Sequence, residues 1–529
     1  MQHRHTANGN SGGRHREFYE VTDDAQRALE ADNDQPQVFI SSSPGRAPSQ
    51  ATQLVELTIT AGIELFHAPD RRGFATIMEN GHDETWPIDA RAFSLWLRNL
   101  YYRHTQRAVS SQVLKEAITT LEAQAIFDAP QYPVSCRLAE QDGIIYLDLA
   151  NERWEAVAIG PDGWEIVPTA SVKFSRSDGM APLPYPERGG RLMELRQFVN
   201  LGSERDWILL TAWLLSALQP VGPYPLLLLY GEHGTAKSHA CRVLRRLIDP
   251  SESPLRAVPP NERNLMVTAV NTWLLTYENV SHLPQWVSDA MCRLATGGGL
   301  SLRKLYRDTH QVHLDAQRPQ ILNSIVEVAT QADLLDRSIV LHLPFISGRQ
   351  RRSEQQFWSD FTDAQPRILG ALLDAVSTAL RNWNQVSLHE PPRMADFAIW
   401  ACAAAPACDW HLPAAGGMLT GEAAFLKAYS TNQQEAVDLA LETSLLSQAV
   451  RTLADRTERW QGSYLDLLDV LQTIASTHTR TAEWPKTPKK LSAELRRLVP
   501  ALRTVGVAID FPSEREAGTG RHLVVVRRH

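Results

Sequence analysis

The stretch that most constrains how this chain can fold is PLLLLYGEHGTAKSHAC, residues 225–241. Residues 226–230 form an apolar run without polar alternation, which is typical of a strand covered on both faces in a parallel sheet. A glycine-containing segment follows, and then an amphipathic helix. One face of this helix would carry Cys241, Leu244 and Ile248. The arginines at 242, 245 and 246 would lie mostly on another face. A strand, a glycine-rich loop and a helix in this order predict a phosphate-binding loop within an α/β fold.

In such a loop the backbone and two side chains hold the phosphates. Glycines let backbone N–H groups approach phosphate oxygens, and the N-terminus of the helix adds a partial positive charge. Lys237 would reach the β- and γ-phosphates, and the Ser238 hydroxyl would hold Mg²⁺. The strict motif has glycine where Ala236 stands. We therefore expect ATP and Mg²⁺ as cofactors, and the residues expected to line the nucleotide are Gly231, Glu232, His233, Gly234, Thr235, Ala236, Lys237, Ser238 and His239.

Later strands predict further polar groups for the same chemistry. The apolar strand TWLLTY ends at Glu278, roughly 40 residues after the loop, and such an acid positions Mg²⁺ through its water shell. The strand RPQILN ends at Asn323, whose amide would orient the attacking water. Arg337 would reach the nucleotide of a neighbouring subunit and stabilise the transferred phosphoryl group, although an ordinary surface pair with Asp336 is the alternative. The expected catalytic residues are Lys237, Glu278, Asn279, Asn323 and Arg337.

Two basic stretches are candidates for nucleic-acid contact. The segment SLRKLYRDTHQVHL predicts a β-hairpin that carries Arg303, Lys304, Arg307 and His310. From residue 480 onward there are about eleven Lys and Arg against about five acids, in a chain whose net charge is −7. The candidates in this second stretch are Lys489, Lys490, Arg496 and Arg497. For both stretches a merely solvated charged surface is the alternative.

Composition and patterning divide the chain into five parts. These are a polar, disordered tail (1–50), an α+β domain (51–190), a P-loop ATPase core (191–345), a helical lid (346–425), and a helical plus winged-helix DNA-binding domain (426–529). A helix is expected over 51–65, and the proline-rich segment 181–190 reads as a linker.

The remaining composition excludes several classes of protein. Five cysteines scattered without C-x-x-C pairs argue against a disulfide framework or a zinc site. The most apolar region, 207–230, is interrupted by Gln219-Pro220 and Gly222-Pro223, and the apolar arm before this break is too short to cross a bilayer. We therefore expect a cytoplasmic protein with no membrane partner.

With these residues in order, the chain resembles the AAA+ helicases of superfamily 3 and MCM-like type found in phages and integrative mobile elements. The resemblance covers residues 51–529 and is strongest in GEHGTAKS, LLTYENVSHLPQWVSDAMCRLATGGG, SLRKLYRDTHQVHLDAQRPQILN and DLLDRSIVLHLP. It implies a homo-oligomeric ring, expected to be a hexamer, that uses ATP to translocate on single-stranded or forked DNA. A separate primase or initiator is a further partner, since no primase signature precedes the ATPase.

The resemblance also implies roles for individual residues. Lys237 and Ser238 match Walker A, Glu278 matches Walker B, Asn323 matches sensor 1, and Arg337 matches the arginine finger that acts in trans. The residues Lys304, Arg307 and His310 would lie on the hairpin that grips DNA, and Arg393 is a candidate second arginine sensor. Relatives often show Asp-Asn where this chain has Glu278-Asn279.

Two functions remain open from the sequence. The first is an ATP-dependent DNA helicase for replication of a phage or mobile element. The alternative is a nucleotide-gated DNA-binding initiator, loader or switch ATPase that does not unwind. A small-molecule kinase would leave the basic hairpin, Arg337 and the C-terminal basic stretch without a role.

Overall fold

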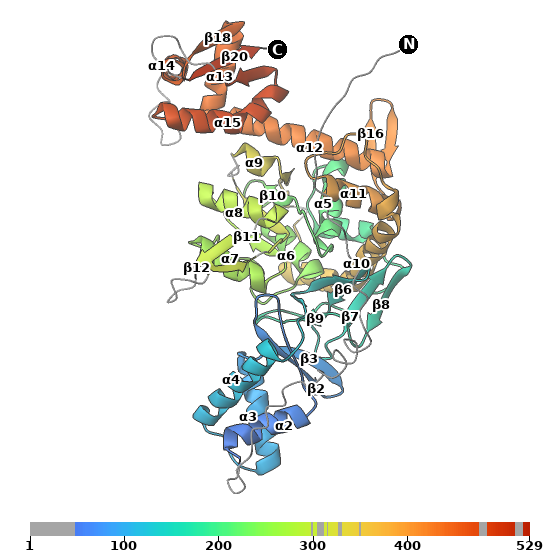
Figure 1. Ribbon diagram of the computed structural model, residues 1–529. Coiled ribbons are helices and arrows are strands. Elements are labelled where there is room, and N and C mark those ends of the chain that lie inside the picture. The colour runs from blue at the N-terminus through green and yellow to red at the C-terminus, as the bar shows by residue number, and fades with distance from the viewer. Residues whose placement is uncertain are drawn as a thin grey trace, which may run out of the picture.

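The computed structural model describes residues 48–297, 300–303, 311–314, 316–325, 331–348, 351–475, 484–513 and 522–528. The expected tail up to residue 47 and the candidate DNA-binding residues Lys304, Arg307 and His310 lie outside these ranges. In Figure 1 the chain forms three bodies in a row, with the N-terminal unit at one end, a central α/β unit, and the C-terminal unit at the other end.

The central unit is built on a parallel sheet whose strand order is β11-β14-β10-β15. The predicted strand β10 is confirmed, and all five of its residues are buried because it lies between β14 and β15. Since the four strands are parallel, their carboxyl ends meet at one edge of the sheet. The elements of the first part of this unit are η1 (Leu192–Phe198), α5 (Glu204–Ala217), β10 (Leu226–Tyr230), α6 (Lys237–Ile248), α7 (Glu262–Asn271), β11 (Leu275–Tyr277), α8 (Gln285–Thr296), β12 (Leu300–Arg303), β13 (Gln311–Leu314), β14 (Gln320–Ser324), α9 (Ala332–Leu335) and β15 (Ser338–His342).

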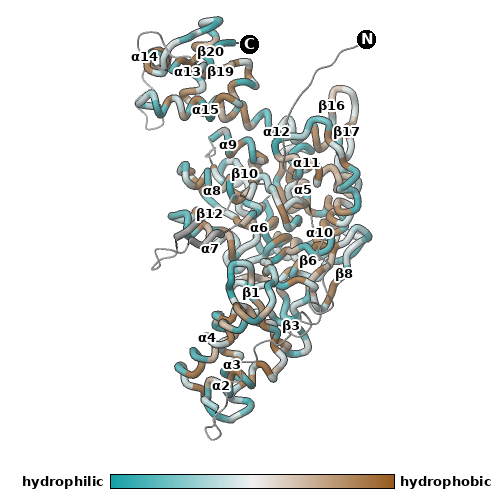
Figure 2. The backbone as a smooth tube through the Cα atoms, in the orientation of Figure 1, coloured by the Kyte–Doolittle hydropathy of each residue, from teal (hydrophilic) through white to brown (hydrophobic). Residues whose placement is uncertain are grey.

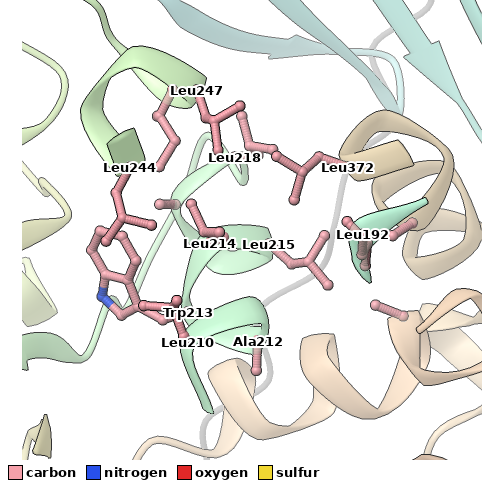
Figure 3. Packing of buried hydrophobic residues seen from close by; sticks show 14 of the residues in the cluster. Leu192, Leu210, Ala212, Trp213, Leu214, Leu215, Leu218, Leu244, Leu247 and Leu372 are labelled. Carbon is pink, nitrogen blue, oxygen red and sulfur yellow. The ribbon is translucent and has the colours of Figure 1, made fainter. Parts of the chain in front are cut away.

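Helix α5 lies at the centre of the core and is buried along its length. Its sequence, ERDWILLTAWLLSA, is apolar on every side after the first turn, as expected of a helix surrounded by other elements. Figure 3 shows its leucines and Trp213 packed against residues of α6, η1 and α10. The Trp213 indole N–H donates to the Pro225 carbonyl at 2.8 Å, so its polar group is satisfied. No helix among the described residues is long and apolar enough to cross a membrane.

The segment expected to be a helical lid is mostly helical, but it also contains a β-hairpin of β16 and β17. Helix α12 continues past residue 425 and covers the edge strand β15, where the Asn432 amide donates to Val340 O at 2.7 Å and accepts from Val340 N at 3.0 Å. The elements are α10 (Glu354–Asn382), η3 (Trp383–Gln385), α11 (Ala395–Ala404), η4 (Ala405–Ala407), β16 (His411–Ala414), β17 (Gly417–Thr420) and α12 (Gly421–Thr443).

The N-terminal unit has its own hydrophobic core beneath an antiparallel sheet, β1-β2-β3. Its helices alternate between hydrophobic and hydrophilic residues along the tube in Figure 2, as one-sided burial requires. The helix expected over 51–65 ends earlier, at Thr60, because the chain then enters strand β1. The elements are α2 (Gln50–Thr60), β1 (Glu64–His67), β2 (Gly73–Glu79), β3 (His82–Pro87), α3 (Arg91–Thr105) and α4 (Ser111–Phe127).

A four-stranded antiparallel meander, β5-β6-β7-β8, follows and packs on the central unit. Most of its buried apolar residues belong to the same core cluster as α5, and Trp164 Nε1 donates to Asp374 of α10 at 2.8 Å. The core of the central unit therefore extends across residue 190. The strands are β4 (Val134–Ser135), β5 (Leu138–Gln141), β6 (Ile144–Asp148), β7 (Ala156–Gly160), β8 (Gly163–Val167) and β9 (Lys173–Phe174).

The prediction of a linker at 181–190 is wrong. Glu187 N donates to Pro366 O at 2.9 Å, so the segment runs against α10. A Cβ on Gly370 would lie 1.8 Å from Glu187 O, and one on Gly190 would lie 2.1 Å from Arg367 O. Only glycine permits so close an approach of two backbones, which the proline and glycine content alone did not reveal.

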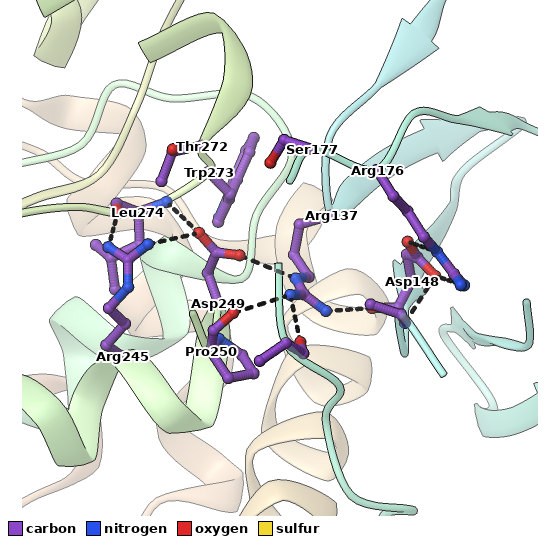
Figure 4. A network of polar contacts seen from close by, with 12 residues as sticks. Arg137, Asp148, Arg176, Ser177, Arg245, Asp249, Pro250, Thr272, Trp273 and Leu274 are labelled. Atoms are coloured by element: carbon purple, nitrogen blue, oxygen red, sulfur yellow. Dashed lines mark hydrogen bonds and ion pairs between the residues drawn. The ribbon is translucent and has the colours of Figure 1, made fainter. Parts of the chain in front are cut away.

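A buried ionic network joins the meander to the end of α6 (Figure 4). The Arg137 side chain is fully buried and donates to Asp249 Oδ1 at 3.0 Å and to the carbonyls of Asp148 and Ala181. Asp249 also contacts Arg245 at 3.5 Å. Arg245, which the sequence pattern did not mark as buried, is 2% exposed, and this carboxylate provides the partner that a buried guanidinium needs.

We expect Asp249→Ala to lower the free energy of unfolding by about 3–5 kcal/mol, because two buried guanidinium groups lose their carboxylate. Urea unfolding of the full chain measures this change. The matched control is Asp510→Ala, which breaks the half-exposed Arg527–Asp510 pair and should cost less than about 1 kcal/mol. Equal, small effects of the two substitutions would show that the network does not stabilise the junction.

The C-terminal unit combines three helices with an antiparallel sheet of order β18-β20-β19. A hydrophobic cluster of its own holds it together, and α15 also contacts α9 and α12 of the central unit. The elements are α13 (Leu445–Arg456), β18 (Arg459–Ser463), α14 (Tyr464–Ala475), α15 (Pro488–Thr504), β19 (Val507–Asp510) and β20 (Leu523–Arg528).

Candidate nucleotide-binding site

The loop after β10 has the tight geometry that its glycines predict. Gly234 has φ 83°, in the left-handed region. A Cβ on Gly231 would lie 2.8 Å from both Leu343 O and Thr235 Oγ1. Ala236 takes a left-handed φ of 63° immediately before α6, at the position where the strict motif has glycine. The alanine thus reproduces the backbone conformation of the motif, at some cost in strain.

Lys237 lies inside this loop rather than in solvent. Its ammonium group donates to Gly231 O at 2.6 Å, to Glu232 O at 2.8 Å and to Thr235 Oγ1 at 3.3 Å. Burial lowers the pKa of this ammonium group, since only part of its hydration is replaced. The loop therefore encloses a positive charge that its own carbonyls hold in place, and anionic oxygens would be better partners for it.

Ser238 and Glu278 meet where the carboxyl ends of the parallel strands lie. Ser238 Oγ lies 3.4 Å from Glu278 Oε2, although the two residues follow strands that are separated by β14. A hydroxyl and a carboxylate oxygen are ligands that Mg²⁺ accepts, and Mg²⁺ usually takes its other ligands from water and phosphate. Among the described residues, no group of three or more His, Cys, Asp and Glu side chains could hold a metal alone. The donor set thus fits a cation that arrives with a phosphate ligand.

Asn279 and Asn323 contact each other behind this pair. The Asn279 backbone N–H donates to Asn323 Oδ1 at 3.0 Å, and Asn279 has a left-handed φ of 53°. The Asn323 amide N–H group contacts Cys241 Sγ at 3.3 Å, and burial raises the pKa of that thiol to about 12. Asn323 is fully buried. In this conformation its amide fixes the turn that presents Glu278.

His239 lies on the outer side of the loop against the start of α10. Its ring is stacked on Trp358, with centroids 5.8 Å apart, and Arg246 covers Trp358 from 4.3 Å. Burial, and then the charge of Arg242, lower the pKa of His239. His239 thus packs between helices α6 and α10, whereas Glu232 and His233 are exposed in the loop.

Sequence reasoning missed two residues beside the loop. The Asn200 amide donates to Thr235 O at 3.1 Å. A Cβ on Gly234 would lie 3.2 Å from Arg351 Nη2, so this guanidinium group sits directly over the loop. The arginine-rich run before α10 was the available signal for Arg351, but the run alone does not say which arginine turns toward the loop.

Arg337 lies at the opposite ends of the strands, where the amino ends of the parallel sheet meet. Its carbonyl accepts from Leu226 N at 2.9 Å, so it sits at the amino ends of β10 and β15. The five residues of β15 separate it from the loop edge by about 17 Å. Its guanidinium group pairs with Asp333, whereas Asp336, the partner in the alternative interpretation, pairs with Arg393. Although burial opposes it, the bond to Arg337 lowers the pKa of Asp333.

The basic candidates of the C-terminal unit separate onto two sides of α15. Lys489 and Arg496 line a pocket. Arg497 faces the central unit, with Nη2 lying 2.6 Å from the Gln285 carboxamide of α8. Lys490 lies in the first turn of α15, where its backbone N–H donates to Thr487 Oγ1. Arg303 is the last residue of β12, which pairs antiparallel with β13 as the hairpin prediction requires.

Fold and site together define an α/β protein that carries a glycine-rich loop and a serine–carboxylate pair at one edge of a parallel sheet. Residues 190–414 match the family of the actinomycete integrative conjugative element replication protein, and residues 446–529 match the C-terminal domain of the same replication protein. The two matches together span more than half of the chain. The chain therefore belongs to this family of mobile-element replication proteins.

Comparison with individual proteins adds little. No curated protein is significantly similar to the chain. An apo structure of the NrS-1 C-terminal region, in its A form, is 12% identical, with a TM-score of 0.41, and the alignment covers 90% of this chain and 99% of that chain. A second apo structure of this region, residues 305–718, is also 12% identical, with a TM-score of 0.36, and covers 91% of this chain and 100% of that chain. Likeness at this level carries no argument about function.

Proposed function

We propose that this replication protein is an ATP-dependent DNA helicase that works as a ring. The observation that carries the proposal is the meeting of Lys237, Ser238 and Glu278 at one edge of the sheet, with Ser238 Oγ and Glu278 Oε2 3.4 Å apart. These are the groups that hold a nucleoside triphosphate and its Mg²⁺ in the phosphate-binding loops of ATPases. A replication protein that hydrolyses ATP has strand separation as an obvious use for the energy.

The proposed chemistry uses the residues of the loop for binding and for charge stabilisation. Lys237 would exchange its carbonyl partners for the β- and γ-phosphate oxygens, and the loop N–H groups would hold the remaining oxygens. Mg²⁺, held by Ser238 and through water by Glu278, would neutralise charge on the phosphates. Arg351 lies close enough to the loop to contribute a further positive charge. Asn323 would be a positioning residue, because its hydrogen bond to Asn279 N holds the turn that carries Glu278.

The placement of Arg337 favours an oligomer. An arginine that stabilises the transferred phosphoryl group must touch it, and Arg337 is separated from its own loop by the length of β15. It could reach only the loop of a neighbouring chain, as a head-to-tail interface within a ring permits. Contact with single-stranded or forked DNA would then involve the hairpin of β12 and β13 and the C-terminal unit.

The topology supports the AAA+ and winged-helix parts of the proposal. Strand β14, which carries Asn323, lies between β10 and β11. The loop after β10, Asn323 and Glu278 therefore converge at the carboxyl ends of these strands. In the C-terminal unit the order helix, strand, helix, helix, strand, strand is the arrangement that a winged helix would have. Helix α15 would then be the helix presented to DNA.

A specific observation favours the second candidate, a nucleotide-gated initiator, loader or switch ATPase. The Asn323 side chain is fully buried and both ends of its amide contact protein groups, so in this conformation it is not accessible to an attacking water molecule. Slow hydrolysis, suited to a switch, would follow if this arrangement persisted with nucleotide bound.

We expect Lys237→Ala to abolish ATP hydrolysis, because the loop loses the charge that would bind the β- and γ-phosphates. Steady-state phosphate release with and without single-stranded DNA measures the effect, and Lys115→Ala, a change on the exposed surface of the N-terminal unit, is the matched control. Stimulation by DNA that vanishes only in Lys237→Ala supports the helicase, and forked-duplex unwinding then tests it directly. Slow hydrolysis that ignores DNA would favour the switch.

A further inference from the structure

The C-terminal unit contains a pocket of about 630 Å³ that is separate from the loop described above. It lies between the first turns of α14 and α15 and is closed on a third side by His522, just before β20. Its size is within the range of pockets that hold small organic ligands, a nucleotide among them. Both helix starts are capped, because Thr487 Oγ1 accepts from Lys490 N and Ser463 Oγ accepts from Asp466 N, so the affinity of the pocket for an anion depends on its side chains.

One face of α15 supplies the charge of this pocket. Lys489, Ser492 and Arg496 recur at helical spacing and all line it, while Leu491 and Leu495 of the same helix are buried on the other side. Among the described residues that line the pocket, none is acidic. Within the described residues, neither Lys489 nor Arg496 pairs with a carboxylate, so both charges remain available for an anionic ligand.

An aromatic wall adjoins these charges. Tyr464, which lines the pocket, is stacked on Phe511 with ring centroids 6.4 Å apart and an interplanar angle of 13°. The Arg496 guanidinium group lies 4.2 Å from the centroid of the Phe511 ring. This contact orients Arg496 without neutralising it, because an aromatic face attracts the cation but carries no net charge.

From this juxtaposition we propose that the pocket binds one nucleotide of a single-stranded nucleic acid, with the phosphate between Lys489 and Arg496 and the base against Tyr464. Phosphate and aromatic groups together are the two contacts that single-strand binding sites combine. A base within a duplex is stacked and paired, and it would not be available to a side chain in a pocket. The site is thus suited to an unpaired nucleotide, which a replication protein meets wherever duplex DNA opens.

The pocket goes beyond the proposed ATPase and does not depend on it. Arg497 lies outside the pocket and contacts Gln285 of the central unit, so the pocket residues of α15 are distinct from those that contact that unit here. Binding at the pocket should occur without ATP and in Lys237→Ala. Failure of this inference and failure of the proposed helicase are therefore separate outcomes.

The test is binding of a fluorescein-labelled oligothymidylate and of a blunt duplex of equal length to the full chain, by fluorescence anisotropy without nucleotide. Ser492→Glu and Ser492→Gln add nearly the same volume to the pocket but differ in charge. We expect Ser492→Glu to weaken binding of the single strand about tenfold or more relative to Ser492→Gln, because its carboxylate repels the phosphate. Arg496→Gln should lower the slope of log affinity against log salt concentration by about 0.7, the value for one phosphate contact on a single strand.

A second pair of variants tests the aromatic wall. Tyr464→Leu should weaken binding of the single strand about five- to a hundredfold through lost stacking, whereas Tyr464→Phe should retain it. Arg503→Gln makes the same charge change on the same face of α15, two turns beyond the pocket, and should change affinity about twofold or less. Circular dichroism of each variant identifies any that fails to fold.

Three results would overturn the proposal. The first is equal affinity of Ser492→Glu and Ser492→Gln for the single strand. The second is a loss of affinity with Arg503→Gln as large as that with Arg496→Gln. The positive charge of α15 would then attract the nucleic acid without a specific contact in the pocket. The third is a loss for the duplex as large as that for the single strand in Tyr464→Leu, since the ligand would then be paired DNA.

Discussion

A mixture of Lys237→Ala and Arg337→Ala chains is expected to hydrolyse ATP, although neither variant does so alone. Arg337→Ala should leave nucleotide binding intact and reduce turnover about a thousandfold or more, which is the usual contribution of an arginine finger. Lys237→Ala keeps Arg337 and can supply it to a neighbouring chain. In randomly mixed rings about a quarter of the sites combine an intact loop with an intact arginine of a neighbour. Phosphate release from the mixture should therefore recover to about a quarter of the wild-type rate.

The control for this experiment is a mixture of Lys237→Ala and Glu278→Gln chains. Both of these changes damage the same side of the site, as the contact between Ser238 and Glu278 shows, so no combination restores it. Thermal unfolding of Arg337→Ala checks that loss of the pair with Asp333 has not destabilised α9. If the first mixture is no more active than its parents while the single variants bind nucleotide, Arg337 is not a finger acting in trans.

Glu278→Gln is expected to reduce ATP hydrolysis about a hundredfold or more while a fluorescent ATP analogue still binds. The amide keeps the shape of the side chain and its contact with Ser238, but it removes the negative charge that would hold hydrated Mg²⁺. Single-turnover phosphate release together with nucleotide titration separates the loss of chemistry from a loss of binding.

A matched substitution elsewhere in the same unit is Glu262→Gln, which loosens a half-exposed pair with Arg293 at the start of α7. It should leave hydrolysis within about twofold of wild type, since an exposed ion pair contributes little. Near-normal hydrolysis by Glu278→Gln would remove this acid from the proposed site. The turn at Glu278 and Asn279, which Asn323 holds in place, would then have no catalytic role.

The local structure around the loop could be predicted from the sequence because each part of the signal is local. Five consecutive apolar residues require burial on both faces, and the glycines and Lys237 require the turn that follows. Glu278 and Asn323 could also be placed from the sequence, because each follows or ends a buried apolar strand. In a parallel sheet the carboxyl ends of such strands lie side by side. The hairpin of β12 and β13 was also predicted from its alternating pattern.

Other features could not be predicted because their partners are distant in sequence. Arg245 is buried together with Arg137, which lies 112 residues from their shared partner Asp249. Segment 181–190 was predicted to be a linker, but it packs on α10 at Gly370. Arg351 lies far from the loop in sequence and was missed. Arg497 was grouped with Arg496 although the two side chains point to different neighbours.

The sequence by itself therefore determined the kind of site this chain contains, because backbone conformation and strand burial depend on neighbouring residues. Only the tertiary structure decided which side chains share that site and which are held elsewhere. It placed Ser238 and Glu278 together, turned the Asn323 amide inward, and put Arg337 at the far edge of the sheet. The physical reason is that contacts between distant segments depend on how whole elements pack, and packing is decided by the complete core rather than by any one stretch.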